Sequence, residues 1–111
     1  MKDVEFWGDS VDVIRAFPDS ARQQVGYQLD RVQRGVQPDD FKPMRSVGQG
    51  VEEIRIREEG NAYRVIYIAR FEDAVHVLHA FEKKTQKTAQ RDLDLAKRRL
   101  KELLASRRQR R

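Results

Sequence analysis

The spacing of apolar residues changes after residue 50, from a helical period to the alternation typical of strands. Between residues 20 and 35 apolar side chains recur every three or four positions, which predicts a helix that ends at Gly35. After residue 50, Ile54 and Ile56 alternate with charged residues, as in a strand that buries one face. The apolar positions of the predicted helix are Ala21, Val25, Leu29 and Val32.

The segment before this helix predicts a short strand and a short helix. Residues 3–8 alternate weakly and end at a glycine, which suits an edge strand. Asp9 or Ser10 can then cap a helix over residues 11–17, which Pro18 ends. We therefore expect two N-terminal helices separated by a proline.

The segment after the two helices predicts a loop and then three strands. Residues 36–50 hold two prolines and two glycines without a sustained period, so we expect a loop. Residues 51–58, 62–70 and 74–81 have the alternation or the β-branched and aromatic content of strands. Because the turns between them are short, the three strands are expected to form an antiparallel meander.

The last segment predicts a helix that starts near Thr88 and carries one apolar stripe. Residues 106–111, SRRQRR, have nothing to bury and are expected to form a basic, disordered tail. The expected fold is one α+β domain over residues 1–105, with the order β-α-α-β-β-β-α and the helices on one face of the sheet. The stripe comprises Leu93, Ala96, Leu100, Leu103 and Leu104, and the basic residues placed largely elsewhere are Arg91, Lys97, Arg98, Arg99 and Lys101.

The composition narrows the class of protein. A chain of 111 residues with 39% hydrophobic and 37% charged residues fits one soluble domain. No apolar run approaches the roughly 20 residues that span a bilayer, and no signal-peptide pattern opens the chain, so we expect a cytoplasmic protein without a membrane partner. The absence of cysteine excludes disulfides and thiolate metal sites. His76 and His79 would face opposite sides of a predicted strand, so we expect neither a metal site nor a cofactor.

Basic residues concentrate towards the C-terminal end of the chain. Residues 82–111 carry twelve Lys and Arg against four Asp and Glu, a net charge of +8, whereas residues 1–81 carry −3. Such asymmetry indicates a segment that meets nucleic acid, an acidic partner or a membrane surface, or else a solvated charged helix. Lys83, Lys84 and Lys87 crowd at the end of the last predicted strand, where their mutual repulsion favours an anionic ligand.

A second basic group is predicted on one face of the strands. Alternation puts Glu53, Arg55 and Arg57 opposite the apolar side of their strand, and the next strand adds Arg64 among β-branched residues. A guanidinium in such a place is costly unless it is paired. Arg64 either pairs with Glu53 across the strands or lines a concave face and binds phosphate, with Lys83 and Lys84 extending the basic surface.

Three further side chains admit two interpretations each. Tyr63 and Tyr67 bracket Arg64 and either fill the core or stack on a base. His79 either makes hydrogen bonds in the core or exchanges a proton with a ribose hydroxyl. No glycine-rich phosphate loop, nucleophile elbow or thiol indicates another chemistry.

These motifs resemble those of toxins of the RelE/ParE superfamily, in the phage-derived HigB-like branch. The pattern Glu-x-Arg, turn, Tyr-Arg-x-x-Tyr, strand, His-x-Phe-x-Lys-Lys-Thr-x-Lys-Thr carries the resemblance, which covers nearly the whole chain. It implies a RelE-like fold, in which two N-terminal helices pack on an antiparallel sheet. It also implies the toxin half of a type II toxin–antitoxin module.

For RelE-type members the resemblance implies a metal-independent endoribonuclease, or mRNA interferase, that acts in the decoding site of the ribosome. The ribose 2′-hydroxyl attacks the adjacent phosphate, which leaves a 2′,3′-cyclic phosphate and a 5′-hydroxyl. Arg64 matches the arginine that stabilises phosphate charge, and Arg55 and Lys84 match two further basic positions. Glu53, Lys84 and His79 are all candidates for the general base.

The resemblance also implies contacts with RNA and the ribosome. RelE-type enzymes often carry a tyrosine in the C-terminal segment, whereas nothing aromatic follows Phe81 here. The residues expected to contact RNA or the ribosome are Arg57, Lys83, Lys87, Tyr63, Tyr67, Arg91 and Arg98.

The implied partners are a helix-turn-helix antitoxin of the HigA-like kind, the ribosome and mRNA, with operator DNA bound only through the antitoxin. Two other functions stay open. ParE-like members share the fold and inhibit gyrase, but they generally lack the basic set on the sheet. A non-catalytic nucleic-acid-binding module would need only the basic C-terminal segment.

Overall fold

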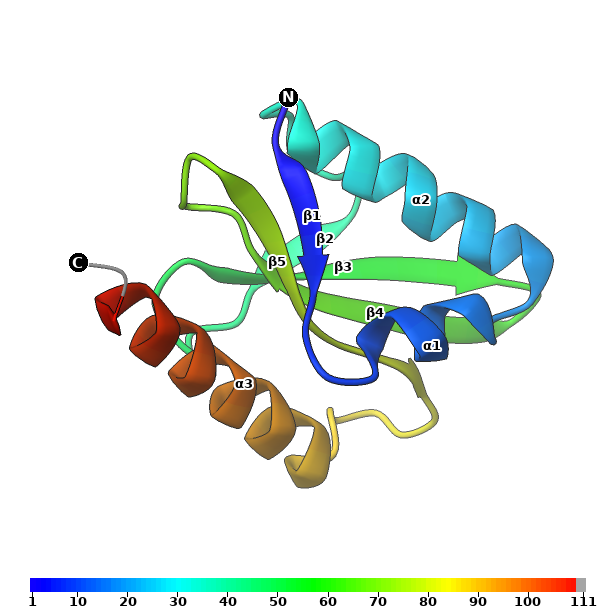
Figure 1. The fold of residues 1–111 in the computed structure, drawn as a ribbon. Helices are drawn as coiled ribbons and strands as arrows, with labels where there is room; N and C mark the ends of the chain where they lie inside the picture. Colours follow the sequence, from blue (N-terminus) through cyan, green and yellow to red (C-terminus); the bar gives the residue numbers. More distant parts are fainter. Residues whose placement is uncertain (110–111) are drawn as a thin grey trace.

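The computed structural model describes residues 1–109, which form an α+β fold around a five-stranded sheet (Figure 1). The elements in chain order are β1 (Asp3–Phe6), α1 (Ser10–Arg15), α2 (Asp19–Gln33), β2 (Phe41–Pro43), β3 (Val51–Glu58), β4 (Asn61–Ile68), β5 (Ala74–Lys83) and α3 (Gln90–Gln109). The expected α+β class, the two N-terminal helices and the antiparallel meander of β3, β4 and β5 are confirmed.

Both edges of the sheet differ from the expectation. The strand order is β1-β5-β4-β3-β2. β1 pairs with β5 in parallel, so the sheet is mixed and not antiparallel. A short turn forces two strands to be antiparallel, but β1 and β5 are far apart in the sequence and can pair in either direction. At the other edge β2, predicted as part of a loop, pairs with β3. Pro43 is tolerated there because an edge strand leaves one side of its backbone unpaired.

Helices cover both faces of the sheet, where one covered face was expected. α1 and α2 pack on the face that carries Ile54 and Ile56, and α3 packs on the opposite face, against Ile66 and Leu78 (Figure 1). β4 and β5 are buried along almost their whole length. Apolar side chains on both sides of these strands must leave water, so each face requires a helix.

The bounds of α3 also differ from the expectation. The helix begins at Gln90, close to the expected start near Thr88, but it continues to Gln109, so residues 106–109 are helical and not disordered. The last two residues of the expected tail, 110 and 111, lie outside the described residues. No helix within residues 1–109 is both long and apolar enough to cross a membrane.

One set of contacts explains why the end of α3 is ordered. The Arg107 guanidinium lies 4.1 Å from the centre of the Phe71 ring and 3.3 Å from a carboxylate oxygen of Asp73. These contacts hold the last turns of α3 against the connection between β4 and β5. A hydrogen bond from Arg107 Nη1 to Asp73 Oδ2 lowers the pKa of Asp73.

Arg99 is buried, although the sequence pattern predicted it largely outside the apolar stripe of α3. It follows Ala96 by three residues, so both side chains lie on the side of α3 that packs against the sheet. Its guanidinium donates hydrogen bonds to the Leu78 carbonyl oxygen at 2.9 Å and to Asp9 Oδ1 at 2.8 Å. The bond to Arg99 lowers the pKa of Asp9. The Asp9 side chain makes no capping hydrogen bond to α1.

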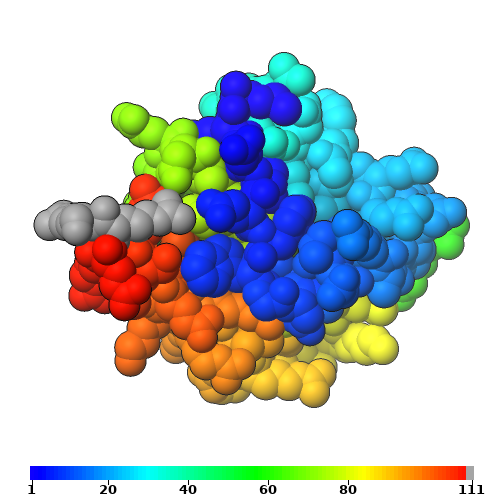
Figure 2. All heavy atoms as spheres, in the orientation of Figure 1, coloured from blue at the N-terminus to red at the C-terminus, as the bar shows by residue number. Residues whose placement is uncertain are grey.

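Gly8 allows the N-terminal segment to approach α3, and in the space-filling view this segment lies between α2 and α3 (Figure 2). Its φ is +57°, and a Cβ atom there would lie 2.4 Å from the Arg99 guanidinium. We expect Gly8→Ala to lower the free energy of unfolding by about 1–3 kcal/mol, because the left-handed backbone and the crowding are both unfavourable for alanine.

Urea denaturation measures this change. The matched control is Gly26→Ala in the middle of α2, where a Cβ atom would meet nothing within 4 Å. That variant should raise the free energy of unfolding by about 0.5–1 kcal/mol, because alanine favours a helix. Equal shifts in both variants would contradict the role given to Gly8.

Candidate active site

One face of the sheet carries many of the residues predicted from the sequence. In the antiparallel pairs Arg55 lies opposite Arg64, and Lys42 of β2 lies opposite Glu53. Paired residues project to the same side of a sheet, which here is the side that α3 covers in part. We call this set the cationic face, and it comprises Lys42, Glu53, Arg55, Arg57, Arg64 and Lys83.

Glu53 and Arg64 form a buried ion pair within the cationic face. Arg64 Nε lies 3.5 Å from Glu53 Oε1. Arg64 is 4% exposed and Glu53 is 0% exposed. Of the two interpretations of Arg64, the salt bridge across the strands is therefore confirmed. The pair is incompletely bonded, because neither carboxylate oxygen of Glu53 nor Arg64 Nε makes a hydrogen bond. Arg64 Nη1 donates one to the Tyr63 carbonyl oxygen. A pair buried in this way can gain from an additional polar partner.

The pKa values of Glu53 and Lys83 are shifted towards each other. Burial raises the pKa of Glu53 above its usual 4.5, against the opposing effect of Arg64, Lys42 and Lys83. Burial and the nearby charge of Arg64 lower the pKa of Lys83 below its usual 10.5. A carboxylate and an ammonium group with pKa values displaced towards neutrality are the components that general acid–base catalysis requires.

A β-bulge changes the side to which the end of β5 projects. Tyr67 pairs with Val77, but Ile66 pairs with His79, so Leu78 has no residue opposite it. The two strands therefore run with one register before the bulge and with another after it. A one-residue shift moves every later side chain of β5 to the other face relative to β4.

Because of this bulge, Lys83 and not Lys84 belongs to the cationic face. Lys83 pairs with Ala62 and projects on the side of Arg64, whereas Lys84 follows the end of the strand and is exposed. The resemblance matched Lys84 to a basic position, whereas the lysine on the side of Arg64 is Lys83. Lys84 lines a cavity of about 170 Å³ with Arg91, and Lys83 borders this cavity as well as the cationic face.

The two histidines lie on the same side of β5, not on opposite sides as expected, because the bulge separates them. His76 accepts a hydrogen bond from Trp7 Nε1 at 3.1 Å. His79 Nε2 bonds to Asp92 Oδ1 of α3 at 2.8 Å, and its Nδ1 lies 3.4 Å from Arg99 Nη1. With both ring nitrogens engaged and 6% of the residue exposed, His79 joins α3 to the sheet, as the core interpretation of this residue expects.

The two tyrosines expected to stack on RNA are core residues on the α1 and α2 side of the sheet. Tyr63 packs against Phe17, with 4.8 Å between the ring centres. Tyr67 donates a hydrogen bond from its hydroxyl to Glu52 Oε1 at 2.8 Å. Burial and this bond raise the pKa of Tyr67. Alternation along β4 puts both rings on the side opposite Arg64, so neither reaches the cationic face.

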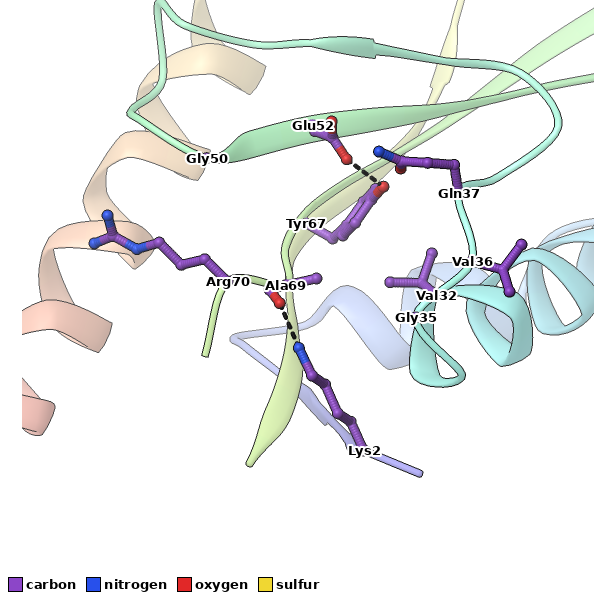
Figure 3. A pocket seen from close by; sticks show the side chains of 10 residues that line it. All are labelled: Lys2, Val32, Gly35, Val36, Gln37, Gly50, Glu52, Tyr67, Ala69 and Arg70. Atoms are coloured by element: carbon purple, nitrogen blue, oxygen red, sulfur yellow. Dashed lines mark hydrogen bonds between the residues drawn. The ribbon is translucent and has the colours of Figure 1, made fainter. Parts of the chain in front are cut away.

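Tyr67 lines a cavity of about 300 Å³ between the end of α2, the N-terminal segment and the end of β4 (Figure 3). The hydroxyl of Tyr67 is bonded to Glu52, and Lys2 Nζ donates to the Ala69 carbonyl oxygen at 2.6 Å. The Tyr67 hydroxyl and the Lys2 ammonium group therefore each have a hydrogen-bond partner within the protein. We assign no chemistry to this cavity.

A groove of about 490 Å³ adjoins the cationic face. Lys42 and Arg45 line one side of it, and Lys83 and Lys87 line the other. Sequence reasoning missed Lys42 and Arg45, because their segment shows no sustained period. The alternation of Phe41 with Lys42 was the available signal, since Phe41 lies opposite Ile54 and so places Lys42 on the other side.

The remaining predicted RNA contacts are spread over the surface. Arg57 is exposed on the cationic face, and Lys87 lies in the groove. Arg91 lies beside Lys84. Arg98 is exposed on α3, about two turns beyond Arg91 and outside both the cationic face and the groove.

The sequence matches a known family over most of the structure described above. Residues 12–101, from α1 into α3, match the family described as phage derived protein Gp49-like (DUF891). A search of curated proteins found no relative with a significant match. The chain therefore belongs to the Gp49-like family of phage-derived proteins, a family of toxin-like proteins in toxin–antitoxin systems.

Proposed function

We propose that this protein is the toxin of a type II toxin–antitoxin module and that it cleaves mRNA on the ribosome without a metal. The observation that carries the proposal is the cationic face, where Glu53 and Lys83 have oppositely shifted pKa values beside Arg55 and Arg64. Membership of a family of toxin-like proteins supports the biological setting.

The reaction is an attack of the ribose 2′-oxygen on the adjacent phosphorus. The Glu53 carboxylate accepts the proton of the 2′-hydroxyl, and the bond between phosphorus and the 5′-oxygen breaks. The Lys83 ammonium gives its proton to the leaving 5′-oxygen, so the products are a 2′,3′-cyclic phosphate and a 5′-hydroxyl. Arg55 and Arg64 stabilise the additional negative charge on the phosphate oxygens in the transition state.

The buried ion pair gives substrate binding a role in activating the base. In the free protein Glu53 is buried against Arg64. When the substrate phosphate takes Arg64 as its partner, Glu53 loses the interaction that opposes the rise of its pKa. The carboxylate then becomes a stronger base, and the mechanism requires the side chains that cover it to move aside when RNA binds.

A second candidate function is non-catalytic binding of nucleic acid. The observation in its favour is the almost complete burial of both Glu53 and Arg64. Such a protein would inhibit translation by occupying its site, without cutting RNA.

The two functions are separated by mapping RNA ends in a translation reaction that contains purified ribosomes and a defined mRNA. We expect new fragments with a 5′-hydroxyl at one end and a 2′,3′-cyclic phosphate at the other, and only when ribosomes are present. Inhibited translation with full-length mRNA would overturn the nuclease proposal and favour binding alone.

We further propose a helix-turn-helix antitoxin as the partner that restrains the toxin, with operator DNA bound through that antitoxin. The net charge of +8 on residues 82–111 favours approach to ribosomal RNA or to an acidic segment of the antitoxin.

A further inference from the structure

We propose that the groove beside the cationic face binds the phosphate backbone of single-stranded RNA that flanks the cleavage position. Lys42 and Arg45 contact phosphates from one side and Lys83 and Lys87 from the other. The inference rests on the proposed function for the identity of the polyanion. It adds Lys42 and Arg45 to the residues that position the substrate.

The cations of the groove form no ion pair within residues 1–109. Within residues 1–109, no carboxylate oxygen lies within 4.0 Å of a side-chain nitrogen of Lys42, Arg45, Lys83 or Lys87. Four arginines elsewhere on the surface form ion pairs, whereas other exposed cations within residues 1–109, such as Arg57 and Lys97, form none, so it is the concave setting of the groove that distinguishes its cations. The paired examples are Arg22 with Asp19, Arg31 with Asp39, Arg34 with Asp30 and Arg107 with Asp73.

The groove is built by two segments that are distant in sequence. One is β2 with the turn that follows it, and the other is the end of β5 with the loop that leads to α3. Four like charges repel each other, so bringing them to one concave surface is unfavourable unless an anion binds between them.

The groove is continuous with the place where the chemistry is proposed. Lys42 and Lys83 line the groove, and both also act electrostatically on Glu53. If the scissile phosphate of a bound RNA lies at Arg64, the neighbouring phosphates of that RNA would therefore lie between the two sides of the groove. This continuity favours RNA over an acidic peptide as the occupant.

The groove supplies four cations but no ring on which a base could stack. No aromatic ring or histidine contributes to it, so the stacking platforms that bind bases are lacking there. Contacts to phosphates position a nucleic acid but carry no sequence information. Within the groove, base identity could be read only through hydrogen bonds from side chains such as Gln86 and Gln90.

The test measures the salt dependence of binding to a 2′-O-methyl RNA of about 10 nucleotides, a length typical of single-strand sites. Its blocked 2′-oxygen prevents cleavage, so binding is measured without catalysis. Fluorescence anisotropy is recorded between about 50 and 200 mM KCl. We expect log K to fall against log salt with a slope of about −3, because each of four phosphate contacts contributes about −0.7 on a single strand.

The decisive variant is the double substitution Lys42→Met and Arg45→Met, for which we expect the slope to become less steep by about 1.4. The matched control, Lys97→Met with Lys101→Met, removes two exposed charges from α3 outside the groove and should leave the slope unchanged. Circular dichroism verifies that both variants are folded.

An unchanged slope in the Lys42→Met, Arg45→Met variant, or an equal loss in the control, overturns the inference. Tighter binding of poly-glutamate than of the oligonucleotide at the same salt also overturns it, in favour of an acidic protein partner. A smaller slope in the variant supports the groove even if no mRNA is cleaved on ribosomes, in which case only the nuclease proposal fails.

Discussion

Lys83→Met is expected to slow the cleavage of mRNA on the ribosome by a factor of about 10² to 10⁴, the usual contribution of a positioned general acid. Methionine keeps most of the length of the side chain but has no proton to give to the leaving 5′-oxygen. Lys83 is the lysine of β5 that projects on the side of Arg64, and its pKa is lowered by burial and by that charge. The measurement is the single-turnover rate of cleavage on programmed ribosomes.

The neighbouring lysine provides the discriminating comparison. Lys84→Met removes the same charge one position later, from an exposed side chain beyond the end of β5, and should change the rate less than tenfold, or by under about 1.4 kcal/mol. Lys101→Met on α3 serves as a control for the loss of one positive charge. If Lys84→Met were as slow as Lys83→Met, the assignment from the strand register would be wrong.

The pH dependence of the rate gives an independent readout of the same assignment. Glu53 must be deprotonated to act as the base, so the rate should fall when the pH drops through its raised pKa. Lys83 must be protonated to act as the acid, so the rate should fall when the pH rises through its lowered pKa. The Lys83→Met variant should lose the alkaline fall and keep the acidic one. A retained alkaline fall would assign the acid to another group.

Arg64→Ala is expected to lower the free energy of unfolding by about 3–5 kcal/mol, because it leaves the buried Glu53 carboxylate without its partner. A loss of activity in this variant alone would therefore not identify a catalytic role for Arg64. Urea denaturation measures the change, and the exposed Arg57→Ala variant should stay within about 0.5 kcal/mol of the original protein.

A double substitution separates the stability of the fold from its chemistry. Glu53→Leu with Arg64→Met removes both charges and fills the space with apolar atoms. We expect this variant to be as stable as the original protein or more stable, by up to about 1–4 kcal/mol, and to cleave no mRNA. A double variant less stable than Arg64→Ala would contradict the description of the pair as a buried ion pair with incomplete bonding.

The pH dependence of stability follows from the direction of the Glu53 shift. Because its pKa is higher in the folded than in the unfolded protein, the folded state binds more protons between the two values. Stability must then decrease as the pH rises through that interval. Removal of Arg64 raises the folded pKa further, so the destabilisation by Arg64→Ala should be smallest at acidic pH, where Glu53 is protonated. An equal destabilisation at acidic and neutral pH would argue against Glu53 as the cause.

Local patterns determined a large part of this fold from the sequence alone. The helical period ending at Gly35 predicted α2, and the short turns between β3, β4 and β5 predicted their antiparallel order. Alternation along β3 also predicted that Glu53, Arg55 and Arg57 share a face. These predictions hold because each depends on neighbours in the chain, where the geometry of helices and strands leaves few choices.

Contacts between distant segments decided the rest. The parallel pairing of β1 with β5, the pairing of β2 with β3 and the place of α3 on the second face of the sheet depend on which apolar surfaces meet. Local periodicity does not contain that information, and so Lys42 and Arg45 were not predicted as part of the site.

The lysine of the cationic face is the clearest case in which the tertiary structure decided what the sequence left open. Spacing alone leaves Lys83 and Lys84 as equal candidates, and the resemblance favoured Lys84. The bulge at Leu78 shifts the pairing by one residue and turns Lys83 towards Arg64. A strand pattern has a period of two, so one unpaired residue reverses the side of everything beyond it, and only the assembled sheet shows where that residue lies.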